Sequence, residues 1–236
     1  MQRINPTCKR PLLARLGVWL FVAMWPALAP AASVVFTNFG PASTYNTSQG
    51  NPIGNAFDGF TYAEANSFVL SGDAVFSSMR MALSCFASCP DPFSVTLNQD
   101  AGNQPGAVLE TFVVPTGALG TLGASSPPLD LNSVLNPALT NGARYWVTVS
   151  ADPNDSIDWN LNVTGDLSAT ALSADGGLDW FSPSGNTPGA FEVTGVIPEP
   201  GNLKLILGAG LLLTLLGRRR VAAYVLKPKR PVRASA

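Results

Sequence analysis

The stretch that decides the fold is Val75-Phe-Ser-Ser-Met-Arg-Met-Ala-Leu83, in which apolar residues recur with a period of two. In an extended chain, successive side chains point to opposite faces. One face of this stretch is predicted to hold Val75, Met79, Met81 and Leu83. Arg80 and Ala82 fall on the other face. A strand with one buried face is therefore predicted here.

The same alternation recurs later in the chain, in residues 94–98, 145–149 and 191–194. Further short strands are predicted at 34–39, 67–70, 107–114 and 157–163. Glycine-, proline- and asparagine-rich turn signals separate these runs at 71–73, 102–106, 141–142, 175–177 and 188–189. Many short strands with such turns predict an all-β domain, an antiparallel β-sandwich of the jelly-roll kind, over residues 32–197.

Charge is distributed unevenly along the 236 residues. Residues 32–197 contain 14 of the 15 acids but only Arg80 and Arg144 as bases, a formal charge of -12. So acidic a domain is a poor partner for nucleic acid, which proteins bind by neutralising phosphates with Lys and Arg. The acids favour solubility and mutual repulsion, with divalent-cation binding as the sharper alternative.

The first 31 residues have the pattern of a signal peptide. Four bases and no acid precede an apolar run at 16–25, which is too short to span a bilayer comfortably. The small residues Ala29 and Ala31 suit a signal peptidase, so we expect cleavage after Ala31, with Ala32 as the alternative. The remainder of the chain is then exported.

Export bears on the cysteines, because Cys8 leaves with the signal peptide and only Cys85 and Cys89 remain. An isolated pair in an oxidising compartment is usually a disulfide. The bridge requires the Cα atoms to be within about 7 Å, so the chain must turn between the two residues. Without any histidine or a third cysteine, a metal site is the weaker alternative.

The C-terminal region combines three features in order. Pro198, Glu199 and Pro200 precede an apolar stretch at 203–217, which Arg218, Arg219 and Arg220 close. Fifteen helical residues cover about 22 Å, a marginal length for a hydrocarbon core of about 30 Å. Lys204 can snorkel to the interface, and the arginines favour a cytoplasmic C-terminal end. One crossing is predicted, with the 32–197 domain outside.

Residues 198–220 resemble the PEP-CTERM sorting region of bacterial proteins, since triplet, short helix and arginine cluster occur together behind a signal peptide. The resemblance implies recognition of Pro198-Glu199-Pro200 by exosortase, a membrane-embedded transpeptidase that removes the tail. Family tails usually end soon after the arginines, whereas a basic cytoplasmic tail, 221–236, follows here. A permanent single-pass anchor is the alternative.

Residues 60–196 resemble the choice-of-anchor exported domains, most closely type R. The resemblance rests on Ala65-Asn-Ser-Phe68, Asn103-Gln-Pro-Gly106, Gly142-Ala-Arg-Tyr-Trp146 and Gly189-Ala-Phe-Glu-Val-Thr-Gly195. It implies no particular activity.

Composition removes most enzyme chemistries. The chain has no histidine, and residues 32–197 have no lysine, which excludes catalytic triads, the usual zinc sites and lysine-based nucleophiles. A glycosidase-like pair of carboxylates is the chemistry that remains. An enzyme is therefore not predicted, and a carboxylate-based hydrolase is the third-ranked function.

Two places are candidate binding sites. Asp152, Asn154, Asp155 and Asp158 offer oxygen ligands for calcium, although the alternative is a polar turn between strands. Among the tryptophans Trp146, Trp159 and Trp180, the first two fit core packing, and Trp180 with its neighbour Phe181 is the candidate for contact with a sugar.

Together these features predict a non-enzymatic bacterial cell-surface or extracellular-matrix protein associated with exopolysaccharide or biofilm. It is expected to be exported, anchored in the inner membrane during sorting, and then released to the surface or outside. Its expected partners are signal peptidase, exosortase and extracellular polysaccharide, with the membrane contacted through one C-terminal helix. No cofactor is predicted, calcium being the alternative. A lectin-like carbohydrate- or calcium-binding module is the second-ranked function.

Overall fold

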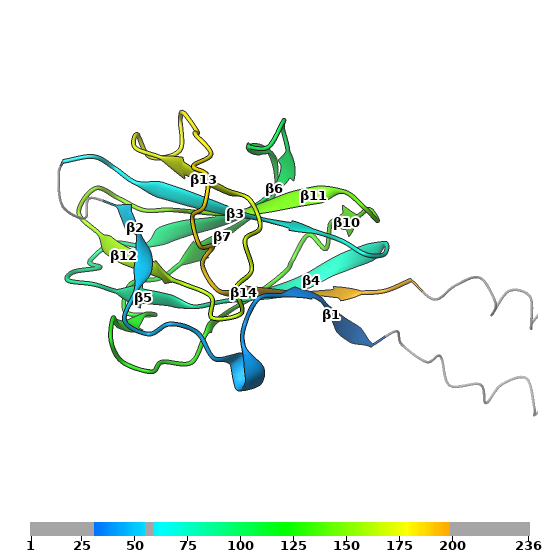
Figure 1. The fold of residues 1–236 in the computed structure, drawn as a ribbon, viewed down its shortest axis with the longest axis horizontal. Coiled ribbons are helices and arrows are strands. Elements are labelled where there is room, and N and C mark those ends of the chain that lie inside the picture. Colours follow the sequence, from blue (N-terminus) through cyan, green and yellow to red (C-terminus); the bar gives the residue numbers. More distant parts are fainter. Residues whose placement is uncertain (1–30, 55–58, 199–236) are drawn as a thin grey trace, which may run out of the picture. The chain divides into compact units, whose positions relative to one another are not determined.

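The computed structural model describes residues 31–54 and 59–198. These residues form three β-sheets, and every strand pair is antiparallel except the short parallel pair between β5 and β8 (Figure 1). The predicted all-β class with antiparallel sheets is confirmed.

Each sheet draws its strands from distant parts of the chain. The first has the order β1 (Ala32–Thr37), β14 (Phe191–Val196), β4 (Ala74–Met81) and β10 (Ala138–Leu139), with β9 (Leu129–Asn132) also on β4. The second has the order β13 (Thr170–Ser173), β3 (Ala63–Val69), β11 (Arg144–Ser150), β6 (Phe93–Asp100) and β7 (Pro105–Val114). The third has the order β2 (Gly50–Gly54), β12 (Ser156–Asn160), β5 (Leu83–Cys85) and β8 (Gly120–Thr121). A 3₁₀ turn, η2, occupies Pro41–Ser43.

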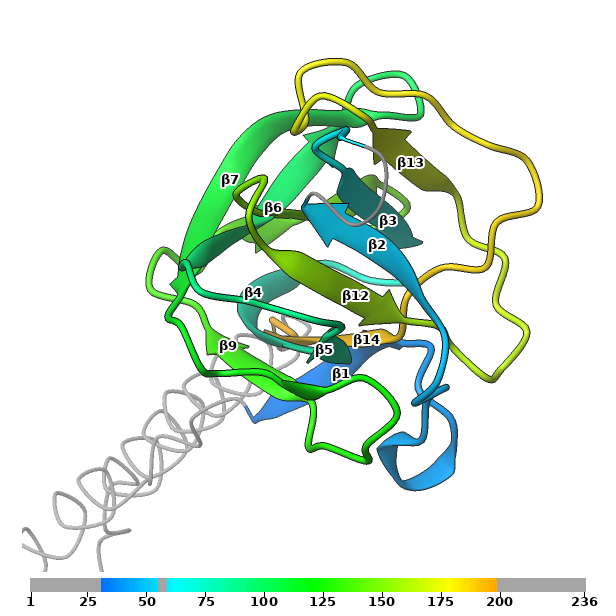
Figure 2. The same ribbon diagram turned by 90° about the vertical axis from the view of Figure 1, so that its left-hand side faces the viewer.

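The first and third sheets adjoin at a corner around Ala82, where β4 continues into β5. The Ala82 N–H donates to the Ala190 carbonyl at 3.0 Å, and the Ala190 N–H donates to the Asn160 carbonyl at 2.7 Å. The Asn160 N–H completes the triangle by donating to the Ala82 carbonyl at 2.8 Å. Because these bonds replace ladder pairing at the strand ends, β12 and β14 are held beside each other (Figure 2).

One hydrophobic cluster draws side chains from all three sheets. It includes Phe76, Met79 and Met81 of β4, Val95 and Leu97 of β6, Val147 and Val149 of β11, Ile157 and Trp159 of β12, and Phe191 and Val193 of β14. The Phe191 ring lies 4.8 Å from Phe36 and 5.7 Å from Trp159 between ring centroids. Burying each such side chain contributes roughly 1.5–3 kcal/mol. This shared core is consistent with a β-sandwich.

The predicted core face of β4 is wrong at Val75. Phe76 is fully buried in the core, whereas Val75 is only half-buried. The cause is a β-bulge: Thr194 pairs with Ser78 and Gly195 with Phe76, so Ser77 has no opposite residue in the β14 ladder. An extra residue reverses the alternation, so Met79 and Met81 face the core as predicted and Val75 does not.

The two ends of the described domain lie side by side. β1 pairs with β14 along its length, and Ala32 lies opposite Val196. The first and last strands of the domain therefore support each other directly (Figure 1).

Candidate functional site

Four acidic side chains in residues 31–54 and 59–198 are at most 7% exposed: Glu64, Glu110, Asp155 and Asp158. A buried carboxylate is costly unless a cation or hydrogen-bond donors compensate it. In the described part of the chain, Arg80 pairs with Asp130 and Glu192, and Arg144 donates to Asn103. Neither arginine neutralises a buried acid. The donors around each carboxylate therefore distinguish structural acids from candidate binding groups.

Glu110 of β7 is fully compensated. Its Oε1 accepts from the N–H groups of Val134 at 2.6 Å and Leu135 at 3.0 Å, and its Oε2 accepts from the Ser133 hydroxyl at 2.5 Å. Burial opposes ionisation, but these three donors together lower the pKa of Glu110. Glu110 ties the loop after β9 to β7, which is a structural role.

Glu64 of β3 points into the core, because the ladder places it opposite Val149. Its Oε1 accepts from the side-chain amides of Asn51 at 2.7 Å and Asn66 at 3.0 Å. Burial raises the pKa of Glu64 to about 8, and the nearby Asp158 charge adds to the effect, while the two amides and the Gly189 N–H oppose it. Glu64 Oε2 and Asn66 Oδ1 both lack a hydrogen bond of normal geometry. A neutral, protonated Glu64 lowers the cost of this burial, because a neutral carboxyl is much less costly to desolvate than a carboxylate.

Asp155 and Asp152 belong to the loop between β11 and β12. The Asp152 carbonyl accepts from the Asp155 N–H at 3.0 Å, and Asp152 Oδ1 accepts from the N–H and the amide of Asn154 at 3.1 and 2.8 Å. Asp155 Oδ1 accepts from the Asp91 N–H at 3.2 Å. Burial raises the pKa of Asp155, and the charges of Asp91 and Asp152 add to it. These contacts form the polar, side-chain-capped turn that was the alternative to a calcium loop.

The four residues of the calcium prediction do not share one cluster in the structure. Asp152, Asn154 and Asp155 belong to the turn, whereas Asp158 lies on β12 and lines a groove on the other side of that strand. Across the described ranges, no three acidic, histidine or cysteine side chains converge closely enough to hold a metal ion. Calcium binding by this segment stays a prediction.

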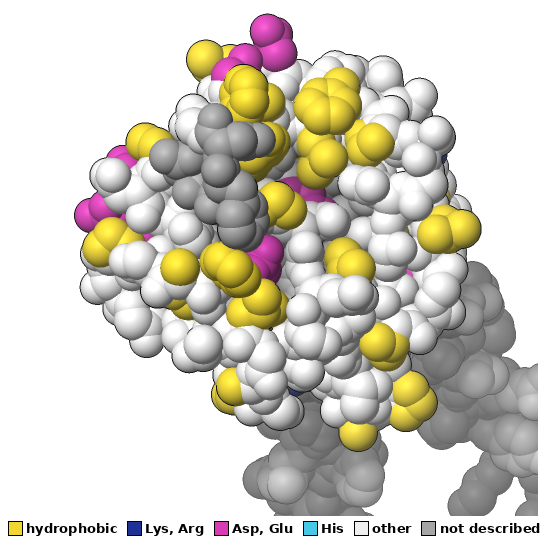
Figure 3. Space-filling model, turned by 60° about the vertical axis from the view of Figure 1, so that its left-hand side comes forward, with side chains coloured by type: hydrophobic (Ala, Val, Ile, Leu, Met, Phe, Trp, Pro, Cys, Tyr) yellow, Lys and Arg dark blue, Asp and Glu magenta, His cyan; other side chains and the backbone are white. Residues whose placement is uncertain are grey.

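Asp158 differs from the other buried acids, because none of the described residues donates a hydrogen bond to it. It is 7% exposed, and burial alone raises its pKa. Its neighbours along β12, Ile157 and Trp159, point into the core, so Asp158 points to the opposite face. There it lines an open groove of about 420 Å³, together with Ser48, Gln49, Gly50, Pro52, Phe86, Leu122 and Leu161. Figure 3 shows this side of the molecule, with acidic side chains set between hydrophobic ones in its hollowed part.

Backbone hydrogen bonds hold the walls of the Asp158 groove. The Leu161 N–H donates to the Gln49 carbonyl at 3.0 Å, the Leu122 N–H to the Cys85 carbonyl at 2.9 Å, and the Phe86 N–H to the Ser156 carbonyl at 2.8 Å. A Cβ at Gly50 would lie 2.8 Å from the Asp158 Cβ, so glycine leaves the space beside the carboxylate open. The groove is therefore preformed by the strands beneath it.

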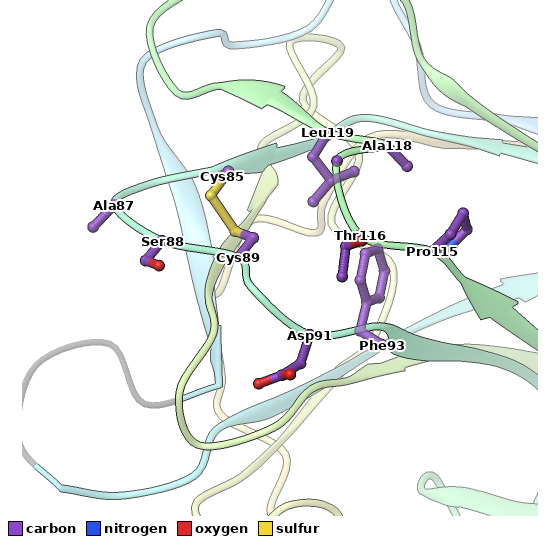
Figure 4. A pocket seen from close by; sticks show the side chains of 11 residues that line it. Cys85, Ala87, Ser88, Cys89, Asp91, Phe93, Pro115, Thr116, Ala118 and Leu119 are labelled. Carbon is purple, nitrogen blue, oxygen red and sulfur yellow. A yellow bond between two sulfur atoms is a disulfide. The ribbon is translucent and has the colours of Figure 1, made fainter.

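Cys85 and Cys89 form a disulfide with Cα atoms 6.0 Å apart, across the turn that the sequence requires. Closing so short a loop contributes about 2 kcal/mol in the chain-entropy model. The bridge borders a small pocket of about 150 Å³ that includes Phe93 and Leu119 (Figure 4). This pocket lies at the end of β5, and its walls are mainly apolar.

Trp180 is half-buried and packs on a small cluster of Ala65, Trp146 and Ala171 on the outer face of the second sheet. Its carbonyl accepts from Gln104 Nε2 at 2.8 Å. Trp146 and Trp159 are fully buried, as predicted for core residues. Phe181, next to Trp180, is 52% exposed. Contact of Trp180 with a sugar stays a prediction.

The predicted processing sites lie at and beyond the ends of the described residues. Ala31 directly precedes β1, and Ala32 is the first residue of that strand. Pro198 is the second residue after β14. Ala29, Glu199, Pro200 and the cluster Arg218, Arg219 and Arg220 lie outside the described residues, as does the predicted membrane helix at 203–217. Within 31–54 and 59–198, no helix is long and apolar enough to cross a membrane.

Comparisons with protein-family models, with curated proteins and with solved structures found no match to this chain.

Proposed function

We propose that this chain is a non-enzymatic bacterial surface or matrix protein, exported by its signal peptide and sorted by exosortase through the Pro198-Glu199-Pro200 tail. The 32–197 domain is the exported part, for which we propose a sandwich of the jelly-roll kind. After sorting, it associates with the cell surface or with extracellular polysaccharide.

One observation carries this proposal: three features stand in the required order within 23 residues at 198–220. A Pro-Glu-Pro triplet alone is a weak signal. Here it precedes an apolar stretch of marginal membrane-spanning length and an arginine cluster of the kind that the positive-inside rule places in the cytoplasm.

The domain boundaries support the proposal as well. β1 starts at Ala32, directly after the expected signal peptidase site, and β14 ends at Val196, two residues before Pro198. Removing residues 1–31 and the residues after the triplet therefore takes away none of the described strands. A processed chain keeps the complete set of described sheets.

Mass spectrometry of the protein isolated from its own cells tests both processing events at once. The expected mature N-terminus is Ala32, or Ser33 with the alternative cut, and residues 203–236 are expected to be absent. Recovery of the intact chain from the cytoplasm with both ends uncut would contradict the proposal. Cleavage at the N-terminus with a retained tail would favour the permanent anchor instead.

A matched pair of variants tests the role of the triplet. Glu199→Ala is expected to leave the tail uncut, because it removes the central residue of the motif. Glu192→Ala makes the same change seven residues earlier, on β14, and is expected to be processed normally. Equal processing of the two variants would count against recognition of the triplet.

A further inference from the structure

The Asp158 groove contains an unusual combination of groups. Asp158 as a whole residue is 7% exposed, receives no hydrogen bond from the described residues, and lines this open groove. Buried polar groups in native proteins nearly always have a partner. The partner for Asp158 must therefore come from water or from a ligand that brings hydrogen-bond donors.

We propose that this groove on β2, β12 and β5 binds a neutral saccharide, whose hydroxyls donate to Asp158 while its apolar face lies against Phe86, Leu122 and Leu161. The groove volume of about 420 Å³ falls within the usual range for small-molecule sites, about 300–1,000 Å³. Its open shape admits the end or the middle of a chain.

The wall chemistry matches the two sides of a sugar ring. A sugar has C–H groups on its ring faces and hydroxyls around its edge. Phe86 is 44% exposed and provides an aromatic surface, while Leu122, Leu161 and Pro52 provide aliphatic surface. In the same groove, Ser48 and Gln49 offer polar atoms that Asn46 holds in place. Asn46 Oδ1 accepts from the Ser48 hydroxyl at 3.2 Å, and Asn46 Nδ2 donates to Gln49 Oε1 at 2.9 Å.

Three other ligand classes fit this groove less well. Calcium needs six to eight oxygen ligands, whereas Asp158 is the only carboxylate among the groove residues and most of the wall is apolar. An acidic polysaccharide would be repelled by a domain with a formal charge of -12. A lysine-rich peptide would satisfy the carboxylate and could lay its methylene stems on the wall, but only one of its ammonium groups would find a carboxylate among the groove residues.

The proposal draws on the proposed function for one point only, that the exported domain meets polysaccharide. Its test is independent of sorting, because binding is measured with purified protein. Loss of sugar binding would leave the processing result unchanged, and a failure of sorting would leave the binding result unchanged.

Isothermal titration calorimetry tests the proposal, with maltohexaose, cellohexaose and laminarihexaose titrated separately into the full chain. The protein is purified in a polyoxyethylene detergent, which carries no sugar. At least one hexasaccharide is expected to bind. Asp158→Ala is expected to weaken that binding by about tenfold or more, because it removes the hydrogen bonds that the sugar hydroxyls donate to a charged group. Phe86→Ala, which removes part of the apolar wall, is expected to weaken it by a similar factor.

Two controls match these changes outside the groove. Asp179→Ala removes an exposed acid, and Phe181→Ala removes an exposed ring. Both are expected to bind within about twofold of the wild type, and thermal melting of every variant separates lost binding from lost folding. Wild-type binding by folded Asp158→Ala would overturn the proposal, as would binding that Trp180→Ala abolishes while the groove variants retain it. Binding of hexalysine but of none of the sugars would overturn it in favour of a basic peptide.

Discussion

At the scale of single residues, the buried carboxylates of this domain show that burial alone does not decide what an acid does. Glu110 and Glu64 are both enclosed, but Glu110 accepts three hydrogen bonds that favour its ionised form. Glu64 has donors on one oxygen only and a second acid, Asp158, nearby. The same side chain is therefore stabilised as a carboxylate at one position and as a neutral acid at the other.

Glu64→Gln is expected to raise the free energy of unfolding at pH 8. The pKa of Glu64 rises from 4.5 to about 8 on folding, so between these values the unfolded chain is ionised while the folded chain holds a proton. Folding is penalised increasingly as the pH rises through this window, by a few kcal/mol at most. Glutamine is neutral at every pH, so this penalty is absent from the variant. Urea unfolding at pH 4 and pH 8, followed by tryptophan fluorescence, checks the gain, which should be small at pH 4.

Glu110→Gln is the matched control and is expected to act in the opposite direction. Because the pKa of Glu110 is lowered on folding, its stabilising contribution is present above the unfolded-state pKa and is lost as the pH falls. At pH 8 the substitution should cost about 1–3 kcal/mol, since hydrogen bonds to a charged acceptor are weakened. A destabilising Glu64→Gln at pH 8 would contradict the assignment of a neutral Glu64.

At the scale of elements, the corner between the first and third sheets depends on the close approach of Gly189 to the Trp159 ring. A Cβ at Gly189 would overlap Trp159. The ring is completely buried, and its Nε1 donates to the Ala190 carbonyl at 3.1 Å. The segment before β14 can therefore cross β12 only if residue 189 lacks a side chain.

Gly189→Ala is expected to destabilise the domain by about 1–3 kcal/mol, because the added methyl displaces a packed ring and strains its hydrogen bond. Gly72→Ala is the control, since a Cβ at Gly72 meets no atom within 4 Å. That change should stay within about 0.5 kcal/mol. Melting temperatures of both variants provide the comparison, and equal values would show that the corner tolerates a side chain.

At the scale of the whole molecule, the domain of residues 32–197 has a formal charge of -12, and its two arginines cannot offset the acids. Like charges on a compact domain repel one another. The Debye length falls from about 30 Å at 0.01 M salt to about 8 Å at 0.15 M. Long-range repulsion should therefore weaken between these salt concentrations, whereas the buried hydrogen bonds should be little affected.

Raising NaCl from 10 mM to 300 mM at pH 7.5 is expected to increase the melting temperature of the domain by a few degrees, roughly what a gain of about 1 kcal/mol produces. At pH 4 many carboxylates are protonated, so the same addition of salt should have a smaller effect. Differential scanning calorimetry at the two pH values measures both. A melting temperature that falls with salt at pH 7.5 would show that short-range ion pairs outweigh the repulsion.

Much of the fold follows from the sequence, because strand alternation is a local property. The alternation in 145–149 and 191–194 correctly places Val147, Val149, Phe191 and Val193 in the core. The assignment fails at Val75 because a bulge depends on the partner strand, β14. β2, with the sequence Gly50-Asn-Pro-Ile-Gly54, and β13 have too few alternating residues to predict, and pairing with β12 and β3 holds them in place.

The candidate groove was predictable only in part. The sequence indicates an acidic segment at 152–158, but nothing in it separates Asp158 from Asp152 or Asp155. Their different surroundings come from residues far along the chain, such as Asp91 beside Asp155 and Leu122 near Asp158. Glu64 likewise gives no sign of burial, because its main donor, Asn51, belongs to another strand.

The sequence by itself determined the β class, the acidic character of residues 32–197, and the order of the residue patterns from which export and sorting are proposed. These properties depend on composition and on neighbours a few residues apart. Tertiary structure alone decided which acids are desolvated, which of them retain donors, and where a carboxylate meets an apolar wall. Desolvation and hydrogen bonding depend on atoms brought together across several strands, and no local pattern records which strands will meet.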